Sequence, residues 1–192
     1  MAEKSWLTLA WPKEYGGHER SQLERYVVIE ELLAAGAPVG AHWIADRQSG
    51  PLLLRLGNEE LKRRWVPEIA RGEAFACIGL SEPGSGSDLA SLQTRAVADG
   101  DDYIINGTKI WTTYAQYANR MFCLVRTATE GKPQAGISFV LLEMDSPGIT
   151  VEPIISMSGN HDINQVFLDD VRVAKANLVG AENDGWSVAK YL

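Results

Sequence analysis

The chain has 192 residues, of which 45% are hydrophobic and 22% are charged, and its formal net charge is −7. This length is sufficient for one or two domains with hydrophobic cores, and the acidic balance argues against a nucleic-acid-binding surface, which requires clustered Lys and Arg. No stretch reaches the roughly 18 apolar residues of a membrane span, and the N-terminus lacks the features of a signal peptide, so we expect a cytoplasmic protein. Cys77 and Cys123 lack metal-ligand spacing, which predicts buried thiols in a reducing compartment and no metal site.

The first third of the chain is predicted to be helical. Ser21 and Glu24 form a capping-box pattern, and it is followed by apolar residues at helical spacing: Leu23, Tyr26, Val27, Ile29 and Leu33. Gly36 and Pro38 should end this helix.

A second helix is predicted to begin after Asn58 and to end near Gly72, with Pro67 expected to bend or shorten it. The apolar residues 42–56 between the two helices are also predicted to be helical.

From Ala74 onwards, short apolar runs alternate with turn residues. The predicted strands are 75–80, 94–98, 103–105, 108–112, 121–126, 137–144, 149–153 and 166–173. Asp99-Gly100-Asp101-Asp102 predicts a turn between strands 94–98 and 103–105. Asn106-Gly107 predicts a second, tight turn before strand 108–112, because both residues tolerate positive φ. Short strands without intervening helices indicate an antiparallel sandwich or barrel, and a further helix is predicted to begin at Gly185.

Two segments could carry chemistry. Residues 80–88 form a Gly/Ser-rich turn whose N–H and hydroxyl groups could hold an anion such as a pyrophosphate, although such turns are also common surface features. The turn matches neither a P-loop nor the dinucleotide fingerprint. Trp111, beside several hydroxyls, suits a flat heteroaromatic ring, but a tryptophan taken by itself is more often a core residue.

Together these segments resemble the signature of acyl-CoA dehydrogenases: Leu-Ser-Glu-Pro at 80–83, Gly-Ser-Asp at 86–88, and Asn-Gly-Thr-Lys-Ile-Trp-Thr-Thr at 106–113. Trp-Pro-Lys-Glu-Tyr-Gly-Gly at 11–17 and Phe-Leu-Asp-Asp-Val-Arg-Val at 167–173 extend the likeness to residues 6–192. The resemblance implies an α+β fold: a shortened N-terminal helical domain at 1–73, an antiparallel β-sandwich or barrel-like middle domain at 74–182, and a truncated start of a C-terminal helical domain at 183–192.

The resemblance also implies FAD as cofactor. Ile78, Leu80 and Ser81 are expected to contact the flavin ring, although Ile78 departs from the aromatic residue of many relatives. Trp111 and Thr113 should supply a face and a hydrogen-bonding partner for the ring. Ser87 should contact the FAD pyrophosphate or the acyl-CoA substrate.

No catalytic residue is assigned within the chain. The family's base is a Glu in the C-terminal helical domain, which this chain is expected to lack. Glu82 is interpreted as a structural turn residue, and His161 and Asp162 as surface or packing residues.

The function implied is α,β-dehydrogenation of an acyl-CoA, with hydride passing to flavin N5 and electrons to an electron-transfer flavoprotein or similar acceptor. His-Asp-Ile-Asn-Gln at 161–165 resembles a subgroup acting on dicarboxylyl-, aromatic- or steroid-side-chain CoA esters, so a homo- or hetero-oligomer is expected. One alternative is a non-catalytic subunit that binds a partner chain. Another is a flavin oxidase or monooxygenase on the same fold.

Overall fold

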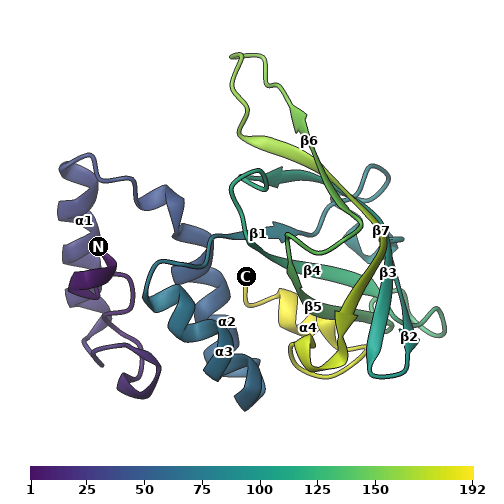
Figure 1. Cartoon of the computed structure of the whole chain (residues 1–192), viewed down its shortest axis with the longest axis horizontal. Coiled ribbons are helices and arrows are strands. Elements are labelled where there is room, and N and C mark those ends of the chain that lie inside the picture. The colour runs from purple at the N-terminus through teal and green to yellow at the C-terminus, as the bar shows by residue number, and fades with distance from the viewer. The chain divides into compact units, whose positions relative to one another are not determined.

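The computed structural model describes residues 1–192, which divide into two compact units, Met1–Phe75 and Ala76–Leu192 (Figure 1). The first unit is helical, with α1 at Gln22–Ala34, α2 at Gly50–Leu56 and α3 at Glu59–Ala70. Short 3₁₀ turns lie at Ala2–Lys4, Lys13–Tyr15 and Val39–Ala41, and a π-helical segment, Ile44–Ser49, leads directly into α2. The predicted helicity of residues 42–56 is therefore confirmed.

Helix α1 begins at the predicted capping box. The Ser21 hydroxyl accepts a hydrogen bond from the Glu24 N–H at 3.2 Å, and the Ser21 N–H donates to the Glu24 carboxylate at 2.8 Å. The helix ends before Gly36, which adopts φ 70°. No residue of α1 is buried, and Leu23 is 71% exposed. The apolar residues predicted for this helix thus remain accessible in this chain.

Helix α3 begins as predicted, since the Asn58 side chain accepts a hydrogen bond from the Leu61 N–H at 2.8 Å. Of the two effects expected of Pro67, bending or shortening, shortening does not occur, because the helix continues through Pro67 to Ala70. A proline removes one intrahelical hydrogen bond. Trp65 and Ile69, which flank it, are fully buried, so packing offsets that loss.

The second unit is a seven-stranded curled sheet with the order β1-β4-β2-β3-β7-β6, in which β5 also pairs with β4. Its strands are β1 Ala76–Gly79, β2 Arg95–Asp99, β3 Asp102–Thr113, β4 Arg120–Arg126, β5 Ile137–Glu143, β6 Ile149–Ile154 and β7 Ile163–Ala174. Short 3₁₀ turns lie at Leu89–Ser91 and Lys175–Asn177, and helix α4, Gly185–Ala189, begins where a helix was predicted. The α+β class is confirmed, but the sheet is mixed, because β1 runs parallel to β4.

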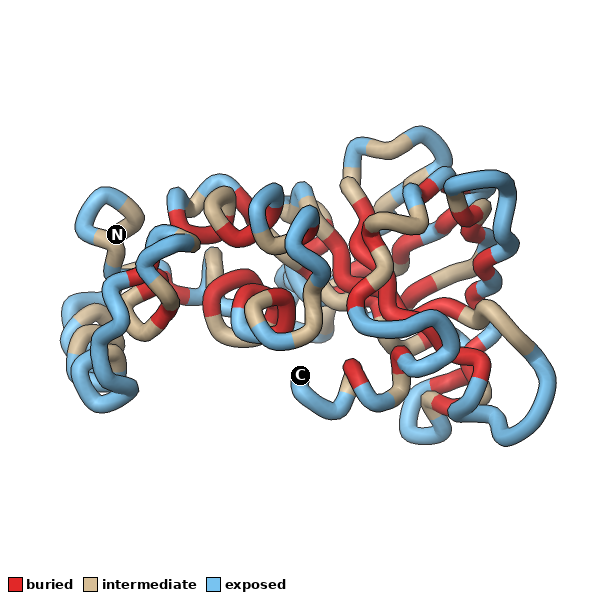
Figure 2. The backbone as a smooth tube through the Cα atoms, turned by 90° about the horizontal axis from the view of Figure 1, so that it is seen from below, coloured by how far each residue is buried: buried red, intermediate tan, exposed pale blue.

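The core of this unit is formed by residues from all of its strands, and Figure 2 shows the buried positions along the backbone. Five residues of β4 and six of β5 are buried in succession, which places both faces of these strands out of solvent. Cys77 and Cys123 are fully buried and unbridged, as predicted. Burial raises the pKa of both thiols, that of Cys123 to about 11.

The prediction of a tight turn at Asn106-Gly107 is wrong. Strand β3 passes through both residues, and the register with β7 shifts there. The Asn106 side chain donates to the Asp170 carboxylate and accepts from the Asp170 N–H, both at 2.9 Å. The extra residue of this bulge lies on β7, where Asp170 adopts φ 50°, and Gly107 opposite it adopts φ 155°. The turn predicted at residues 99–102 is confirmed: it joins β2 to β3, and Gly100 within it adopts φ 60°.

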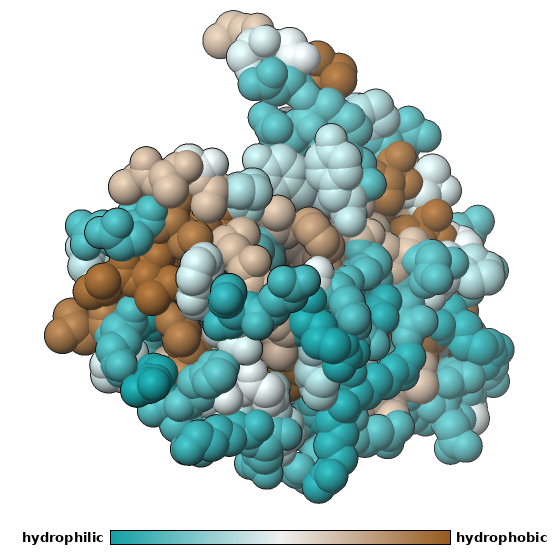
Figure 3. All heavy atoms as spheres, turned by 60° about the vertical axis from the view of Figure 1, so that its left-hand side comes forward, coloured by the Kyte–Doolittle hydropathy of each residue, from teal (hydrophilic) through white to brown (hydrophobic).

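Hydrophobic side chains also reach the surface (Figure 3). The connection between β6 and β7 projects from the sheet (Figure 1) and carries Ile155 and Met157, both largely exposed. No helix in the structure is both long and apolar enough to cross a membrane.

Candidate functional site

The Gly/Ser-rich turn and the strand that carries Trp111 lie side by side. The Ile110 N–H donates to the Ser81 carbonyl at 2.9 Å, and Lys109 Nζ donates to the Leu80 carbonyl at 3.2 Å. These bonds join residues about thirty positions apart in the sequence. They place the Gly/Ser-rich turn directly beside the segment of β3 that carries Trp111.

Trp111 occupies an irregular position in β3. Between Lys109 and Thr112 the register with β7 gains one residue on β3, and Trp111 adopts φ 60°. Its side chain is 57% exposed. Positive φ costs about 1–2 kcal/mol for a residue with a Cβ atom. An exposed tryptophan held in this conformation marks a place where geometry takes precedence over packing.

The other predicted site residues differ in accessibility. Ile78, Leu80 and Ser81 are half-buried, whereas Ser87 and Thr113 are exposed. Thr113 pairs with Ile163 of β7, two residues beyond Trp111. Ser87 lies farther along the turn. Since protein donors already occupy the Leu80 and Ser81 carbonyls, the Ser81 hydroxyl is the group there suited to a ligand.

The turn itself is well ordered by its own hydrogen bonds. Glu82 and Ser85 exchange two backbone bonds of 2.9 and 3.0 Å, and the Ser85 hydroxyl donates to the Asp88 carbonyl at 2.8 Å. A Cβ atom added at Gly84 or Gly86 would meet nothing within 4 Å, so packing does not require these glycines. A hollow of about 470 Å3 runs along the turn and is lined by Glu82, Pro83, Gly84, Ser85, Ser91, Gln93, Thr94, Gly107 and Thr108.

Glu82 is fully engaged by the protein. Its carboxylate lies 2.8 Å from Lys109 Nζ and accepts the N–H groups of Gln93 and Thr94 at 2.5 and 2.9 Å. Burial alone would raise the pKa of Glu82, but the Lys109 charge and these hydrogen bonds together lower it below its ordinary value. Glu82 is therefore a charged structural group, unsuited to accept a substrate proton.

His161 and Asp162 support the end of β3. His161 Nε2 lies 2.7 Å from Asn164 Oδ1, and Asn164 Nδ2 donates to the Thr112 carbonyl at 3.1 Å. The Gln116 amide donates to the His161 carbonyl at 2.7 Å, and the Asp162 carbonyl accepts the Tyr114 N–H at 2.8 Å. Sequence reasoning missed Asn164. Its signal was an amide at an alternate position of β7 that it shares with the core residues Val166 and Leu168.

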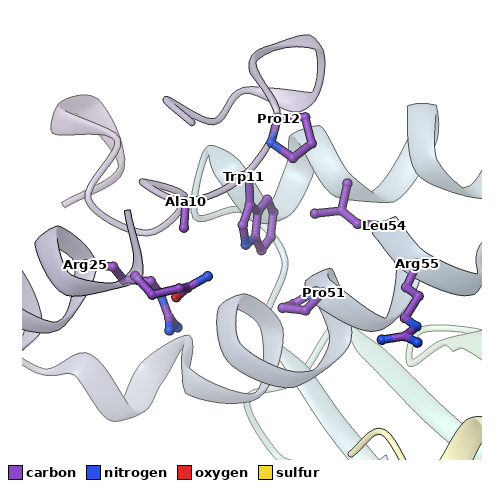
Figure 4. A pocket seen from close by; sticks show the side chains of 8 residues that line it. Ala10, Trp11, Pro12, Arg25, Pro51, Leu54 and Arg55 are labelled. Carbon is purple, nitrogen blue, oxygen red and sulfur yellow. The ribbon is translucent and has the colours of Figure 1, made fainter. Parts of the chain in front are cut away.

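A separate hollow of about 310 Å3 lies in the first unit (Figure 4). Trp11, Pro51 and Leu54 give it apolar walls, and Arg25 and Arg55 lie at its sides. Its lining includes none of the predicted site residues. No group of three or more His, Cys, Asp or Glu side chains is arranged to hold a metal ion.

Known proteins match this chain along almost its whole length. The model for the acyl-CoA dehydrogenase N-terminal domain matches residues 1–73, and that for the middle domain matches residues 77–171. Acyl-CoA dehydrogenase FadE26 of Mycobacterium tuberculosis is 42% identical over 191 residues, which cover 98% of this chain and 47% of that protein. Cyclohexane-1-carbonyl-CoA dehydrogenase of Geobacter metallireducens is 37% identical over 186 residues, 95% of this chain and 48% of that protein.

Solved structures of related proteins also match this chain along almost its whole length. The ChsE4–ChsE5 complex of Mycobacterium tuberculosis superposes with a TM-score of 0.89 at 42% identity, covering 99% of this chain and 49% of that one. The Tcur3481–Tcur3483 steroid acyl-CoA dehydrogenase gives 0.91 at 38% identity, covering 98% and 48%. The fold and the two domain matches define the class: a helical N-terminal domain followed by a β-rich middle domain of the acyl-CoA dehydrogenase type. The chain belongs to the acyl-CoA dehydrogenase family, and it spans about half the length of the curated relatives it matches.

Proposed function

We propose that this chain supplies one side of an FAD site in an acyl-CoA dehydrogenase that introduces an α,β double bond into an acyl-CoA thioester. The observation that carries the proposal is the Ile110–Ser81 hydrogen bond beside the exposed, positive-φ Trp111. It gives an aromatic face and hydroxyl groups along one edge, the combination that a flavin ring requires.

The residues present fit the cofactor. The Ser81 and Thr113 hydroxyls would hydrogen-bond to the ring edge, and the Trp111 indole would pack against the ring. Ile78 and Leu80 would add contacts from β1 and its end, while Ser87 and the open glycines would receive the FAD pyrophosphate or the acyl-CoA. Bound FAD would supply the two-electron acceptor for the hydride that leaves Cβ, and the protein would hold and orient the reactants.

The α-proton of the substrate needs a separate acceptor. Glu82 does not suit this role, because Lys109 and two backbone N–H groups occupy its carboxylate. We propose that the base comes from a further segment or from a partner subunit. Loss of a general base alone typically lowers a rate by about 10²–10⁴.

Relatives that form complexes support the proposal of a partner subunit. Two of the matched structures carry paired names, ChsE4–ChsE5 and Tcur3481–Tcur3483, and the latter is a steroid acyl-CoA dehydrogenase. We extend this to a hetero-oligomer acting on a bulky acyl-CoA, with an electron-transfer flavoprotein or similar acceptor. The second candidate is a non-catalytic subunit that binds a partner chain. The unburied apolar residues of α1 would suit a partner in either candidate.

Purification of the 192-residue chain alone and together with a second dehydrogenase-like subunit tests the proposal. Alone, the chain should bind FAD weakly or not at all, because the ring would have one wall and each Å2 of lost apolar burial costs about 25 cal/mol. The complex should be yellow, bleach anaerobically with an acyl-CoA, and lose FAD on Trp111→Ala but not on Ser156→Ala, a control at an exposed loop.

Three outcomes would contradict the proposal or part of it. A complex that binds acyl-CoA but no flavin would favour the non-catalytic subunit. Rapid reoxidation of the bleached complex by oxygen would favour an oxidase. If the chain alone were yellow and were bleached by an acyl-CoA, the base would have to lie within residues 1–192.

A further inference from the structure

Lys109 of β3 and Glu82 of the Gly/Ser-rich turn form a buried ion pair. Their charged groups lie 2.8 Å apart, with side-chain exposures of 0% and 6%. A buried ion pair contributes little net stability compared with well-packed apolar residues of the same volume, because both charges lose their hydration. Stability alone therefore does not account for the pair.

The pair joins four segments of the second unit. Lys109 Nζ links β3 to the end of β1 through the Leu80 carbonyl at 3.2 Å. Glu82 links the turn to the start of β2 through the N–H groups of Gln93 and Thr94. All these bonds involve charged groups, which strengthens them relative to neutral hydrogen bonds.

Gly79 of β1 leaves room for the aliphatic part of the Lys109 side chain. A Cβ atom at Gly79 would lie 3.1 Å from Lys109 Cγ and 2.9 Å from Met121 Sδ. Glycine at this buried position of β1 therefore lets the Lys109 stem run across the strand towards Leu80 and Glu82.

The residues next to the pair are those of the candidate site. Ile110, the residue after Lys109, donates its N–H to the Ser81 carbonyl, and Trp111 follows at φ 60°. Beyond the bulge, Thr112 resumes its pairing with Asn164 of β7. The strained Trp111 is thus fixed by Lys109 on one side and by β7 on the other. Strained residues persist only where the surroundings restrain them in this way.

We infer that Lys109 and Glu82 are positioning residues that hold Ser81 and Trp111 in the arrangement the ligand requires. The identity of that ligand, FAD, rests on the proposed function, whereas the positioning is a property of this chain. Neither residue needs to touch the ligand.

The sharpest test replaces both charges by apolar residues of similar length, in the double variant Glu82→Leu/Lys109→Met. This change leaves no unpaired buried charge, so it destabilises the fold less than the loss of one charge alone would. Glu82→Gln, which keeps the shape and weakens the pairing, is the milder second variant. Arg172→Met is the matched control, since it removes an exposed ion pair to Asp99 and Asp102 in the same unit.

Two measurements on the full chain decide the inference: hydrogen exchange of the Ile110 amide, and the NMR position of the Trp111 indole N–H. We expect the double variant to remain folded with a lower unfolding temperature, because the Gln93 and Thr94 N–H groups lose their acceptor, to exchange Ile110 at least tenfold faster, and to shift the indole signal. Glu82→Gln should show the same changes at smaller size, and Arg172→Met none. Wild-type exchange and indole position in a folded double variant, or in Glu82→Gln if the double variant does not fold, would overturn the inference.

A third measurement connects the pair to the flavin. In the complex with a partner subunit, FAD should dissociate at least tenfold more readily from the double variant than from the control. If FAD binds equally well to both, the pair does not position the flavin contacts. If the wild-type complex binds no FAD, the proposed function fails, while the exchange experiment still decides whether the pair positions Ser81 and Trp111.

Discussion

Replacing Gly50 with alanine should destabilise the first unit, because the new Cβ atom would lie 2.1 Å from Cη2 and 2.3 Å from Cζ2 of Trp11. Trp11 is 5% exposed, and its place beside Pro51 is visible in Figure 4. The indole cannot recede, since the Trp11 carbonyl accepts the Glu19 N–H at 2.9 Å and the Trp11 backbone packs closely on Gly17.

Two opposing effects set the magnitude. Alanine favours a helix over glycine by about 1 kcal/mol, and Gly50 is the first residue of α2. Overpacking costs about 1–3 kcal/mol, and expelling a buried tryptophan approaches the roughly 3–5 kcal/mol of a Trp→Ala change. The clash should win, with a net loss of about 2 kcal/mol and a fall in Tm of about 10 °C for a domain of this size.

Thermal unfolding followed by tryptophan fluorescence measures the effect. Gly40→Ala is the control, because a Cβ atom there meets nothing within 4 Å. Trp11→Leu should remove most of the penalty of Gly50→Ala, since the two residues are in contact and their effects should not add. A Gly50→Ala variant as stable as Gly40→Ala would refute the reasoning.

The remaining predictions concern single side chains. Ser21→Ala should destabilise α1 by about 1 kcal/mol. Amide hydrogen exchange should become faster in that helix alone, and an equal increase across the first unit would contradict the prediction. Gly107→Ala should lower the unfolding free energy by about 1–3 kcal/mol, because its Cβ atom would lie 2.6 Å from the Thr94 Cα; urea unfolding measures this. The pKa of Glu82 is lowered on folding, so its contribution to stability is present above its ordinary value of 4.5 and is lost as the pH falls through its folded value. Acid titrations of stability should therefore be less steep below pH 4.5 in Glu82→Gln, and identical slopes would show that Glu82 does not contribute.

Local chemistry made several elements predictable. Ser21 with Glu24 and Asn58 before α3 were recognisable as caps, because capping depends on residues within one turn of helix. The wrong prediction of a turn at Asn106-Gly107 arose because local residues do not decide the structure there. The dipeptide tolerates positive φ both in a hairpin turn and in a bulge, and only the pairing of β3 with β7 distinguishes the two.

Strand pairings and ion pairs between residues far apart in the chain could not be predicted from the sequence. Nothing in residues 76–79 indicates a parallel neighbour 44 positions away, so the mixed character of the sheet was not predictable. The Lys109–Glu82 pair joins residues 27 positions apart, and a lysine in an alternating strand suggests a solvent-facing side chain. Recognition of the family motifs pointed to the neighbourhood of Ser81 and Trp111 but not to the buried charges behind it.

Two features of the second unit that oppose folding, the strained Trp111 and the buried Lys109–Glu82 pair, lie next to each other. Trp111 combines positive φ with an exposed indole, so it gains little burial in return for its backbone strain. Lys109 and Glu82 hold buried charges whose lost hydration offsets most of their attraction. Elsewhere in this unit the strands bury mainly apolar side chains, on both faces in β4 and β5. Departures from local consistency that cluster at one edge, and share hydrogen bonds with the Gly/Ser-rich turn, are typical of a site whose geometry serves a ligand.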